Sequence, residues 1–208
     1  MPNDDVLVLK LGAVLILGDN IFHGSTLIKH LASGDAFSEG ATIFAYRVRD
    51  PERYGVLEFN DKGEILSLEE KPIFPKSNYV ATGLYFYDET VIEKLKKVKI
   101  SSNVELEINS LNNMYLKEKK LNVEIMGRGM AWYDTGSNET LYKASSFVRT
   151  LEERQGLKVS CPEEIAWRKQ WISDNELISL SKPLINSGYG NYLIDLLEKP
   201  SLDSLSDK

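Results

Sequence analysis

Two aspartates in short motifs could hold a metal ion. Asp19 lies in GDN (18–20), directly after the apolar run 14–17, which predicts a buried strand that ends in a tight turn. Asp134 lies far along the chain in WYDTG (132–136). Open α/β sheets bind ligands at the carboxyl ends of their strands, and Mg²⁺ takes one or two carboxylates together with water and substrate phosphate. Either aspartate alone is more often a turn former or a helix cap, so the pair needs support from other motifs.

The length and composition of the chain fit a globular protein with one main core. It has 208 residues, of which 42% are hydrophobic and 27% are charged. The net charge of −6 supplies no basic surface, so we expect no nucleic-acid partner. No apolar run reaches the length of a membrane span, so we expect no membrane partner either. The single cysteine, Cys161, excludes an internal disulfide and is expected to be a small buried residue in a cytoplasmic protein.

Strand patterns fill the first two thirds of the chain, and helix patterns fill the last third. A strand run followed by a helix run indicates an α/β core with a helical C-terminal end. We divide the chain accordingly at 1–136 and 137–208, as two parts of one domain. Among the expected elements are strands at 13–17, 42–48, 65–70, 79–87 and 121–126, a hairpin turn at 60–63, and helices at 25–32, 105–116 and 137–151.

Seven short motifs stand in a fixed order along the chain. They are GDNIF (18–22), YGV (54–56), EEKP (69–72), ATGLYFYD (81–88), ELEI (105–108), WYDTG (132–136) and CPEEIAWR (161–168). In this order and spacing the motifs resemble the sugar-1-phosphate nucleotidyltransferases, and among them the glucose-1-phosphate thymidylyltransferases of dTDP-rhamnose and polysaccharide biosynthesis. The resemblance covers about 14–198.

The resemblance implies an activity and a set of site residues. The family joins dTTP and glucose 1-phosphate into dTDP-glucose and releases pyrophosphate, and its fold is a mixed, mostly parallel Rossmann-like sheet flanked by helices. Because the reacting groups are anions, Mg²⁺ and cationic side chains must screen their charge. The motif match assigns Asp19 and Asp134 to the metal, Lys71 to catalysis, and Gly55, Glu70, Lys71, Ala81 and Tyr85 to the sugar phosphate.

Each of these assignments has a structural alternative. Glu70 and Lys71 could form an exposed charged strand end, and Tyr85 could be an aromatic residue of the core. The family also forms a homotetramer with a second, regulatory nucleotide site. The matching positions there are Gly24, Arg128, Ile165 and Arg168, although either arginine could instead belong to a surface ion pair.

The chain also departs from the family pattern. The family's glycine-rich GxGTR segment, which holds the triphosphate, has no counterpart in this sequence, and Asn103, Asn109 and Ser110 stand where the family has an arginine and a Thr-Asp pair. An asparagine cannot replace a bidentate cation. We therefore expect weak or no activity from this chain alone. The alternatives are a non-catalytic sugar-phosphate-binding or assembly subunit, or a remnant without function.

Overall fold

The computed structural model describes residues 12–35, 39–98 and 108–198. The chain divides into two compact units, Met1–Ser146 and Phe147–Lys208, which we call the core unit and the helical unit. The division falls inside helix α4 (Asn138–Gln155). The two-part organisation with a limit at residue 136 stays a prediction.

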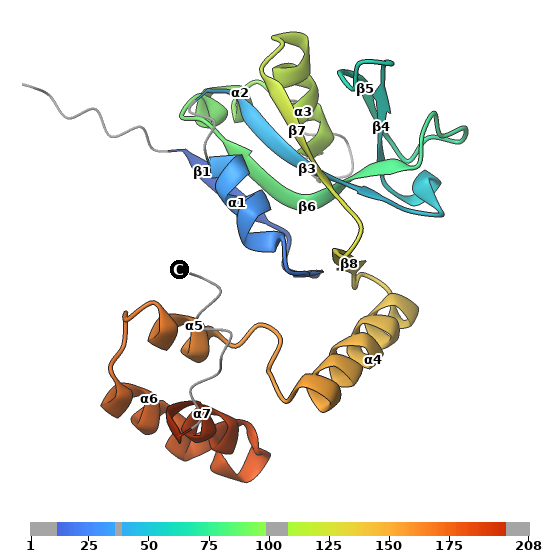
Figure 1. Cartoon of the computed structure of the whole chain (residues 1–208). Helices are drawn as coiled ribbons and strands as arrows, with labels where there is room; N and C mark the ends of the chain where they lie inside the picture. The colour runs from blue at the N-terminus through green and yellow to red at the C-terminus, as the bar shows by residue number, and fades with distance from the viewer. Residues whose placement is uncertain (1–11, 36–38, 99–107, 199–208) are drawn as a thin grey trace, which may run out of the picture. The chain divides into compact units, whose positions relative to one another are not determined.

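A six-stranded mixed sheet forms the centre of the core unit (Figure 1). Its strand order is β5-β4-β6-β3-β7, and β1 pairs with β6 as well. The predicted α/β class is confirmed, but β3–β7 is the one parallel pair among the described strands of this sheet, so less of it is parallel than predicted. A short turn can join antiparallel strands, as residues 60–63 do for β4 and β5, whereas a parallel pair needs a long crossover. The strands are β1 (Ala13–Ile16), β3 (Ala41–Arg47), β4 (Gly55–Phe59), β5 (Ile65–Glu70), β6 (Tyr79–Tyr87) and β7 (Leu121–Met126).

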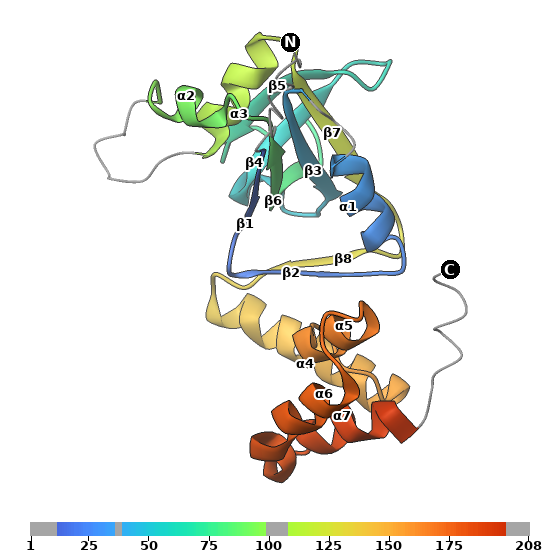
Figure 2. The ribbon, with the colours of Figure 1, turned by 90° about the vertical axis from the view of Figure 1, so that its left-hand side faces the viewer.

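A separate two-stranded ribbon carries both candidate metal ligands. Strand β2 (Asn20–His23) pairs antiparallel with β8 (Ala131–Asp134), and the register places Asn20 opposite Asp134. Figure 2 shows the two strands running side by side at one end of the larger sheet. The ribbon therefore joins the motifs 18–22 and 132–136, which are more than a hundred residues apart in the sequence.

Helices cover the two faces of the sheet. On one face, α1 (Leu27–Asp35) packs through Leu27 and Leu31 against a cluster around Phe44 and Leu84. On the other, α3 (Ile108–Lys117) contributes Leu111 and Tyr115 to the larger core cluster, next to α2 (Val91–Leu95). The predicted helix at 105–116 is seen from Ile108 onward, because 105–107 lie outside the described residues.

The strand before Asp19 is not buried as predicted. Val14, Leu15, Ile16 and Leu17 are 55%, 38%, 59% and 40% exposed. Strand β1 pairs with β6 through backbone hydrogen bonds, but its apolar side chains are largely exposed to solvent. The apolar run therefore predicted the position of the strand correctly and its burial wrongly.

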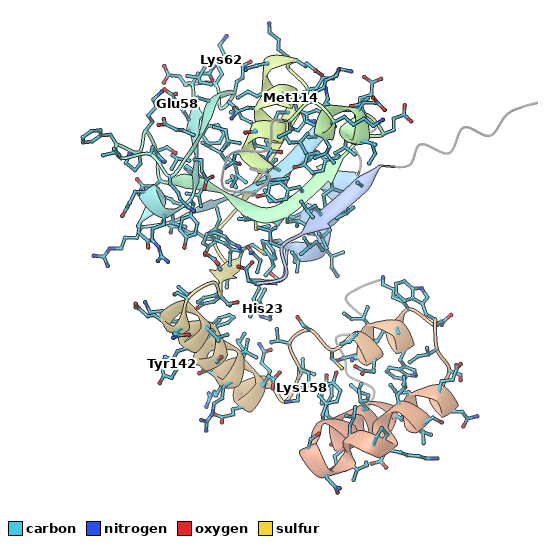
Figure 3. All side chains as sticks on the ribbon, turned by 180° about the vertical axis from the view of Figure 1, so that it is seen from behind. His23, Glu58, Lys62, Met114, Tyr142 and Lys158 are labelled. Atoms are coloured by element: carbon cyan, nitrogen blue, oxygen red, sulfur yellow. The ribbon has the colours of Figure 1, made fainter. Side chains whose placement is uncertain are left out.

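The hairpin of β4 and β5 follows its sequence signal. Asn60 Oδ1 accepts from the backbone N–H groups of Lys62 and Glu64, and Gly63 has a φ of +79°, which favours glycine. Figure 3 shows Lys62 at this turn and Glu58 on β4. The turn fixes the register that places Gly55 opposite Glu70 at the other end of the hairpin.

The helical unit has its own small core. Leu177, Leu193, Leu196 and Cys161 form it, and Cys161 is 3% exposed, as expected. Tyr189 Oη lies 3.0 Å from Cys161 Sγ and donates to Glu163 Oε2 at 2.6 Å. Within the described ranges, no helix is both long and apolar enough to cross a membrane. Besides the end of α4, the helices are α5 (Pro162–Arg168), α6 (Asp174–Ser181), the 3₁₀ helix η2 (Lys182–Ser187) and α7 (Tyr189–Glu198).

One carboxylate fastens the end of β6 to three other segments of the core unit. Asp88 accepts from Gly40 N at 2.7 Å, from Thr90 N at 3.0 Å and from Tyr115 Oη at 3.0 Å. Partial burial opposes the charged form of Asp88, but the hydrogen bonds outweigh it and lower the pKa. The ionised carboxylate therefore stabilises the fold above the unfolded pKa of about 3.9, and this contribution is lost as the pH falls through the lower pKa of the folded state.

We predict that Asp88→Asn lowers the free energy of unfolding by about 1–3 kcal/mol at neutral pH, because an amide presents one acceptor where the carboxylate presents two. The difference from the wild type should shrink in acid, where Asp88 itself takes up a proton. Urea titrations at neutral and acidic pH, followed by circular dichroism, measure it. Asp61→Asn, in the exposed turn at 60–63, is the control and should change little. A difference that persists unchanged in acid would contradict the assignment.

Candidate functional site

The two candidate metal ligands converge beside Gly136. A Cβ atom built on Gly136 would lie 3.1 Å from Asp134 Oδ1 and 3.4 Å from Asp19 Oδ2. One oxygen of each carboxylate therefore lies close to the same point in space. The family resemblance implied that these two aspartates act together, and the β2–β8 register brings them close to each other.

Backbone hydrogen bonds hold the two aspartates in this arrangement. Thr135 donates to the carbonyl oxygen of Asp19 through both its N–H and its hydroxyl, each at 2.8 Å. Gly136 N donates to Asp134 Oδ1 at 3.0 Å. The turn 134–136 thus fixes one carboxylate directly and the backbone that carries the other.

The side-chain amide of Asn20 organises the site further. Its Nδ2 donates to Asp19 Oδ1 at 2.8 Å, and its Oδ1 accepts from Trp132 Nε1 at 2.6 Å and from Gly83 N at 3.2 Å. A Cβ on Gly83 would lie 2.6 Å from Asn20 Cγ, so only glycine leaves room for the amide. Asn20 therefore links Asp19 to β8 and β6, a role that the sequence did not indicate.

The donor set fits Mg²⁺. Within the part of the chain that the structure describes, no group of three or more His, Cys, Asp or Glu side chains could hold a metal. Mg²⁺ does not need one, since it commonly binds one or two carboxylates and keeps water and substrate phosphate as its other ligands. Asp19 and Asp134 meet this requirement.

A second cluster lies where β4 and β5 meet the start of α3. Gly55 and Glu70 face each other in the sheet register. Asn109 Nδ2 donates to Glu70 Oε2, and Lys71 Nζ lies 3.6 Å from Glu70 Oε1. The Lys71 side chain is 67% exposed, and its backbone has a positive φ of 43°, which is uncommon outside glycine. Glu70 and Lys71 thus form an accessible pair of opposite charges.

The space above Gly55 is filled in this structure. A Cβ on Gly55 would overlap the amide of Asn109, a residue that is buried in the core unit. The motif match assigned Gly55 to the sugar phosphate, and that role stays a prediction. In the structure Gly55 makes room for a side chain of α3.

Ala81 and Tyr85 lie in the main core cluster. They are 9% and 3% exposed, and the Tyr85 ring stacks on Tyr87 at 6.1 Å between centroids. Burial, and secondly the charge of Glu70, raise the pKa of Tyr85. Tyr85 is therefore an aromatic residue of the core, and it lies close enough to Glu70 for the charge of Glu70 to affect its pKa.

Residues 53–55 join the two clusters. The Tyr54 carbonyl accepts from Lys71 N at 2.9 Å, while the Tyr54 ring packs edge-on against Trp132 at 5.3 Å. Arg53, at the end of the 3₁₀ helix η1 (Pro51–Arg53), has its pKa raised first by its hydrogen bond to Asp50 and also by the charge of Asp134. The sequence analysis did not identify this cation near the candidate metal ligands, because nothing in its sequence context indicates that it lies near Asp134.

The four predicted regulatory residues belong to both units. Gly24 (φ +152°) packs against Gly129 and Met130 in the turn that also contains the exposed Arg128. Ile165 is 51% exposed, and Arg168 Nε donates to Glu164 Oε1 at 2.8 Å. The first pair is close together within the core unit, and the second lies on α5. Their role as one site stays a prediction.

Comparison with known proteins identifies relatives for most of the chain. A family model described as nucleotidyl transferase matches residues 3–150. The glucose-1-phosphate thymidylyltransferases of Mycobacterium tuberculosis and Neisseria meningitidis are 54% and 50% identical to this protein. Each identity is measured over 185 residues, which is 89% of this chain. The chain spans 64% of the length of each of these two relatives.

Solved structures show the same fold. A Bacillus anthracis protein named as a glucose-1-phosphate thymidylyltransferase, in complex with sucrose, is 38% identical with a TM-score of 0.57, covering 66% of this chain and 55% of that one. A UDP-glucose pyrophosphorylase in complex with UDP-glucose is 24% identical, with a TM-score of 0.57 over 67% of this chain and 56% of that one. The second likeness concerns the fold alone.

We predict that Asn20→Asp lowers the stability of the metal-free protein by about 1–3 kcal/mol at neutral pH, because it removes the donor to Asp19 and adds a third negative charge. Mg²⁺ should restore stability to this variant more than it stabilises the wild type, since a divalent cation offsets the added charge. Thermal unfolding with and without Mg²⁺ measures both effects.

Asn78→Asp is the matched control. Asn78 also donates a hydrogen bond, to Val48 O at 3.1 Å, and among the described residues its side chain has no hydrogen bond to a carboxylate. Equal losses in the two variants, with the same response to Mg²⁺, would contradict the proposed role of the Asn20 amide.

Proposed function

The chain belongs to the nucleotidyl transferase family, and on this basis we propose that it carries out the reaction named for its relatives, glucose-1-phosphate thymidylyl transfer. A phosphate oxygen of glucose 1-phosphate attacks the α-phosphorus of dTTP. The bond between the α-phosphorus and the bridging oxygen of the β-phosphate breaks, so that dTDP-glucose forms and pyrophosphate leaves. The chain spans 64% of the relatives' length, and their full activity is therefore part of this proposal.

The convergence of Asp19 and Asp134 is the observation that carries the proposal. Two carboxylates that each place an oxygen close to the same position repel each other unless a cation lies near them. Mg²⁺, when bound, supplies that positive charge and neutralises part of the triphosphate. Asp19 and Asp134 would hold the ion, and the Asn20 amide would keep the Asp19 carboxylate oriented towards it.

Glu70 and Lys71 would bind the sugar phosphate. The exposed ammonium of Lys71 can pair with the phosphate, which lowers the repulsion between the two anionic substrates. The Glu70 carboxylate can accept hydrogen bonds from sugar hydroxyls through oxygen lone pairs that Asn109 leaves free. Tyr54 contacts Lys71 through its carbonyl and Trp132 through its ring, and this supports a proposal in which the two clusters act together.

The proposal extends to assembly and location. We place the protein in the cytoplasm, where a reducing environment suits a chain with a single free thiol. We also propose a homotetramer with a regulatory nucleotide site that includes Gly24, Arg128, Ile165 and Arg168. The exposed side chains of Ile165 and Arg128 leave both residues available for such contacts.

Pyrophosphate release from purified protein tests the proposal. With glucose 1-phosphate, Mg²⁺ and either dTTP or UTP, we expect release that Asp19→Ala lowers by at least about 10²-fold, because removing one group that stabilises the transferring phosphate has an effect of that order. Asp61→Ala, on the exposed hairpin turn, is the control and should leave release unchanged. Comparing dTTP with UTP gives the preference for the base.

Two results would count against the proposal. Release that is unaffected by Asp19→Ala would place the reaction elsewhere. Folded protein that binds glucose 1-phosphate without releasing pyrophosphate would favour the non-catalytic subunit instead. A slow release that still depends on Asp19 would agree with the weak activity expected from the sequence.

A further inference from the structure

Asn109 makes the one described hydrogen bond between α3 and a charged residue of the proposed sugar-phosphate site. It lies in the first turn of α3, with 6% of its surface exposed, and its Nδ2 donates to Glu70 Oε2. The next two asparagines of the helix bond elsewhere. Asn112 accepts from the Tyr87 hydroxyl at 2.8 Å, and Asn113 donates to the Leu68 carbonyl at 3.0 Å.

The chemistry of the contact fixes the orientation of the amide. An ionised carboxylate only accepts hydrogen bonds, so the NH₂ group of Asn109 must face Glu70. Gly55 makes this approach possible, because a Cβ at that position would overlap the same NH₂ group. Gly55 and Asn109 therefore act together to bring a buried neutral donor against one oxygen of Glu70.

This contact determines what Glu70 presents to a ligand. With Oε2 held by Asn109, Oε1 points towards Lys71, whose Nζ lies 3.6 Å away. Among the described residues, Tyr85 is a second titratable group close to Glu70, and burial, which raises its pKa, keeps its hydroxyl protonated. A neutral amide orients the carboxylate without cancelling its charge, whereas a cation in the same place would compete with the sugar hydroxyls for the same oxygens.

We propose that Asn109 is a positioning residue for sugar-phosphate binding, which acts through Glu70 and leaves nucleotide binding unaffected. The inference rests on the proposed function, since it takes Glu70 and Lys71 as the groups that contact the sugar phosphate. It assigns a binding role to a residue where the sequence pattern departs from the family.

Asn109→Ala and Asn113→Ala form a matched pair that tests the proposal. Both variants remove one amide hydrogen bond between the same helix and β5, so a purely structural role predicts similar effects for the two. We expect Asn109→Ala to weaken the affinity for glucose 1-phosphate about tenfold, and Asn113→Ala to change it less than twofold. Calorimetric titration of the full chain with glucose 1-phosphate, and separately with dTTP, measures this, and dTTP affinity should be the same in both variants. Equal weakening by the two variants, or none by Asn109→Ala, would overturn the proposal.

The Asn109→Asp variant gives a pH dependence of glucose 1-phosphate affinity that a purely structural role of Asn109 would not produce. Two carboxylates in contact share a proton more readily than either takes one alone, so in mild acid the protonated new carboxyl group can donate to Glu70 and replace the lost amide contact. We therefore expect glucose 1-phosphate affinity in the N109D variant to be lowest at neutral pH and to recover as the pH falls, whereas the wild type should not improve. A pH profile parallel to that of the wild type would contradict the proposal.

The proposed function and this inference can fail separately. If the wild type binds glucose 1-phosphate but releases no pyrophosphate, the variants still decide the role of Asn109. If the folded wild type does not bind glucose 1-phosphate at all, the proposed sugar site is wrong and the inference falls with it.

Discussion

Electrostatic repulsion between two carboxylates is the constraint on which this site depends. One oxygen of Asp134 and one of Asp19 lie 3.1 Å and 3.4 Å from the position that a Cβ on Gly136 would take, and two negative charges in one region repel each other when no cation is present. The β2–β8 ribbon, the turn after Asp134 and the Asn20 amide hold the two carboxylates together against that repulsion. The ribbon is in turn attached to β6 through Gly83, so the position of Asp19 depends on the main sheet.

The same physical solution occurs twice in the core unit. At each cluster an asparagine amide donates to a carboxylate, and at each the amide lies over a glycine that leaves space for it: Asn20 over Gly83, and Asn109 over Gly55. A neutral donor directs the carboxylate and leaves its negative charge available for a cation or for hydroxyl groups. The two glycines are therefore explained by the side chains that cover them.

Local sequence signals predicted the elements well. The strands β6 and β7 and the hairpin turn between β4 and β5 follow from strand alternation and turn residues. Environment was harder to predict, as the exposed apolar residues of β1 show, since burial depends on what other segments cover. The hydrogen bonds that connect the site residues could not be predicted from sequence patterns. Asn20 and Trp132 are 112 residues apart in the sequence, and Asn109 and Glu70 are 39 residues apart. The first contact needs the β2–β8 ribbon and the second needs α3 packed beside β5, so neither is visible in a local pattern.

The buried thiol of the helical unit has a practical consequence. Cys161 is the only cysteine in the chain, it lies beneath the Tyr189 hydroxyl, and burial raises its pKa, so very little reactive thiolate is available in the folded unit. A thiol reagent can modify it only when the core around Leu177, Leu193 and Leu196 opens. The labelling rate of the unaltered protein therefore reports how often this helical unit opens, and it gives a local stability that a whole-molecule melting curve would average away.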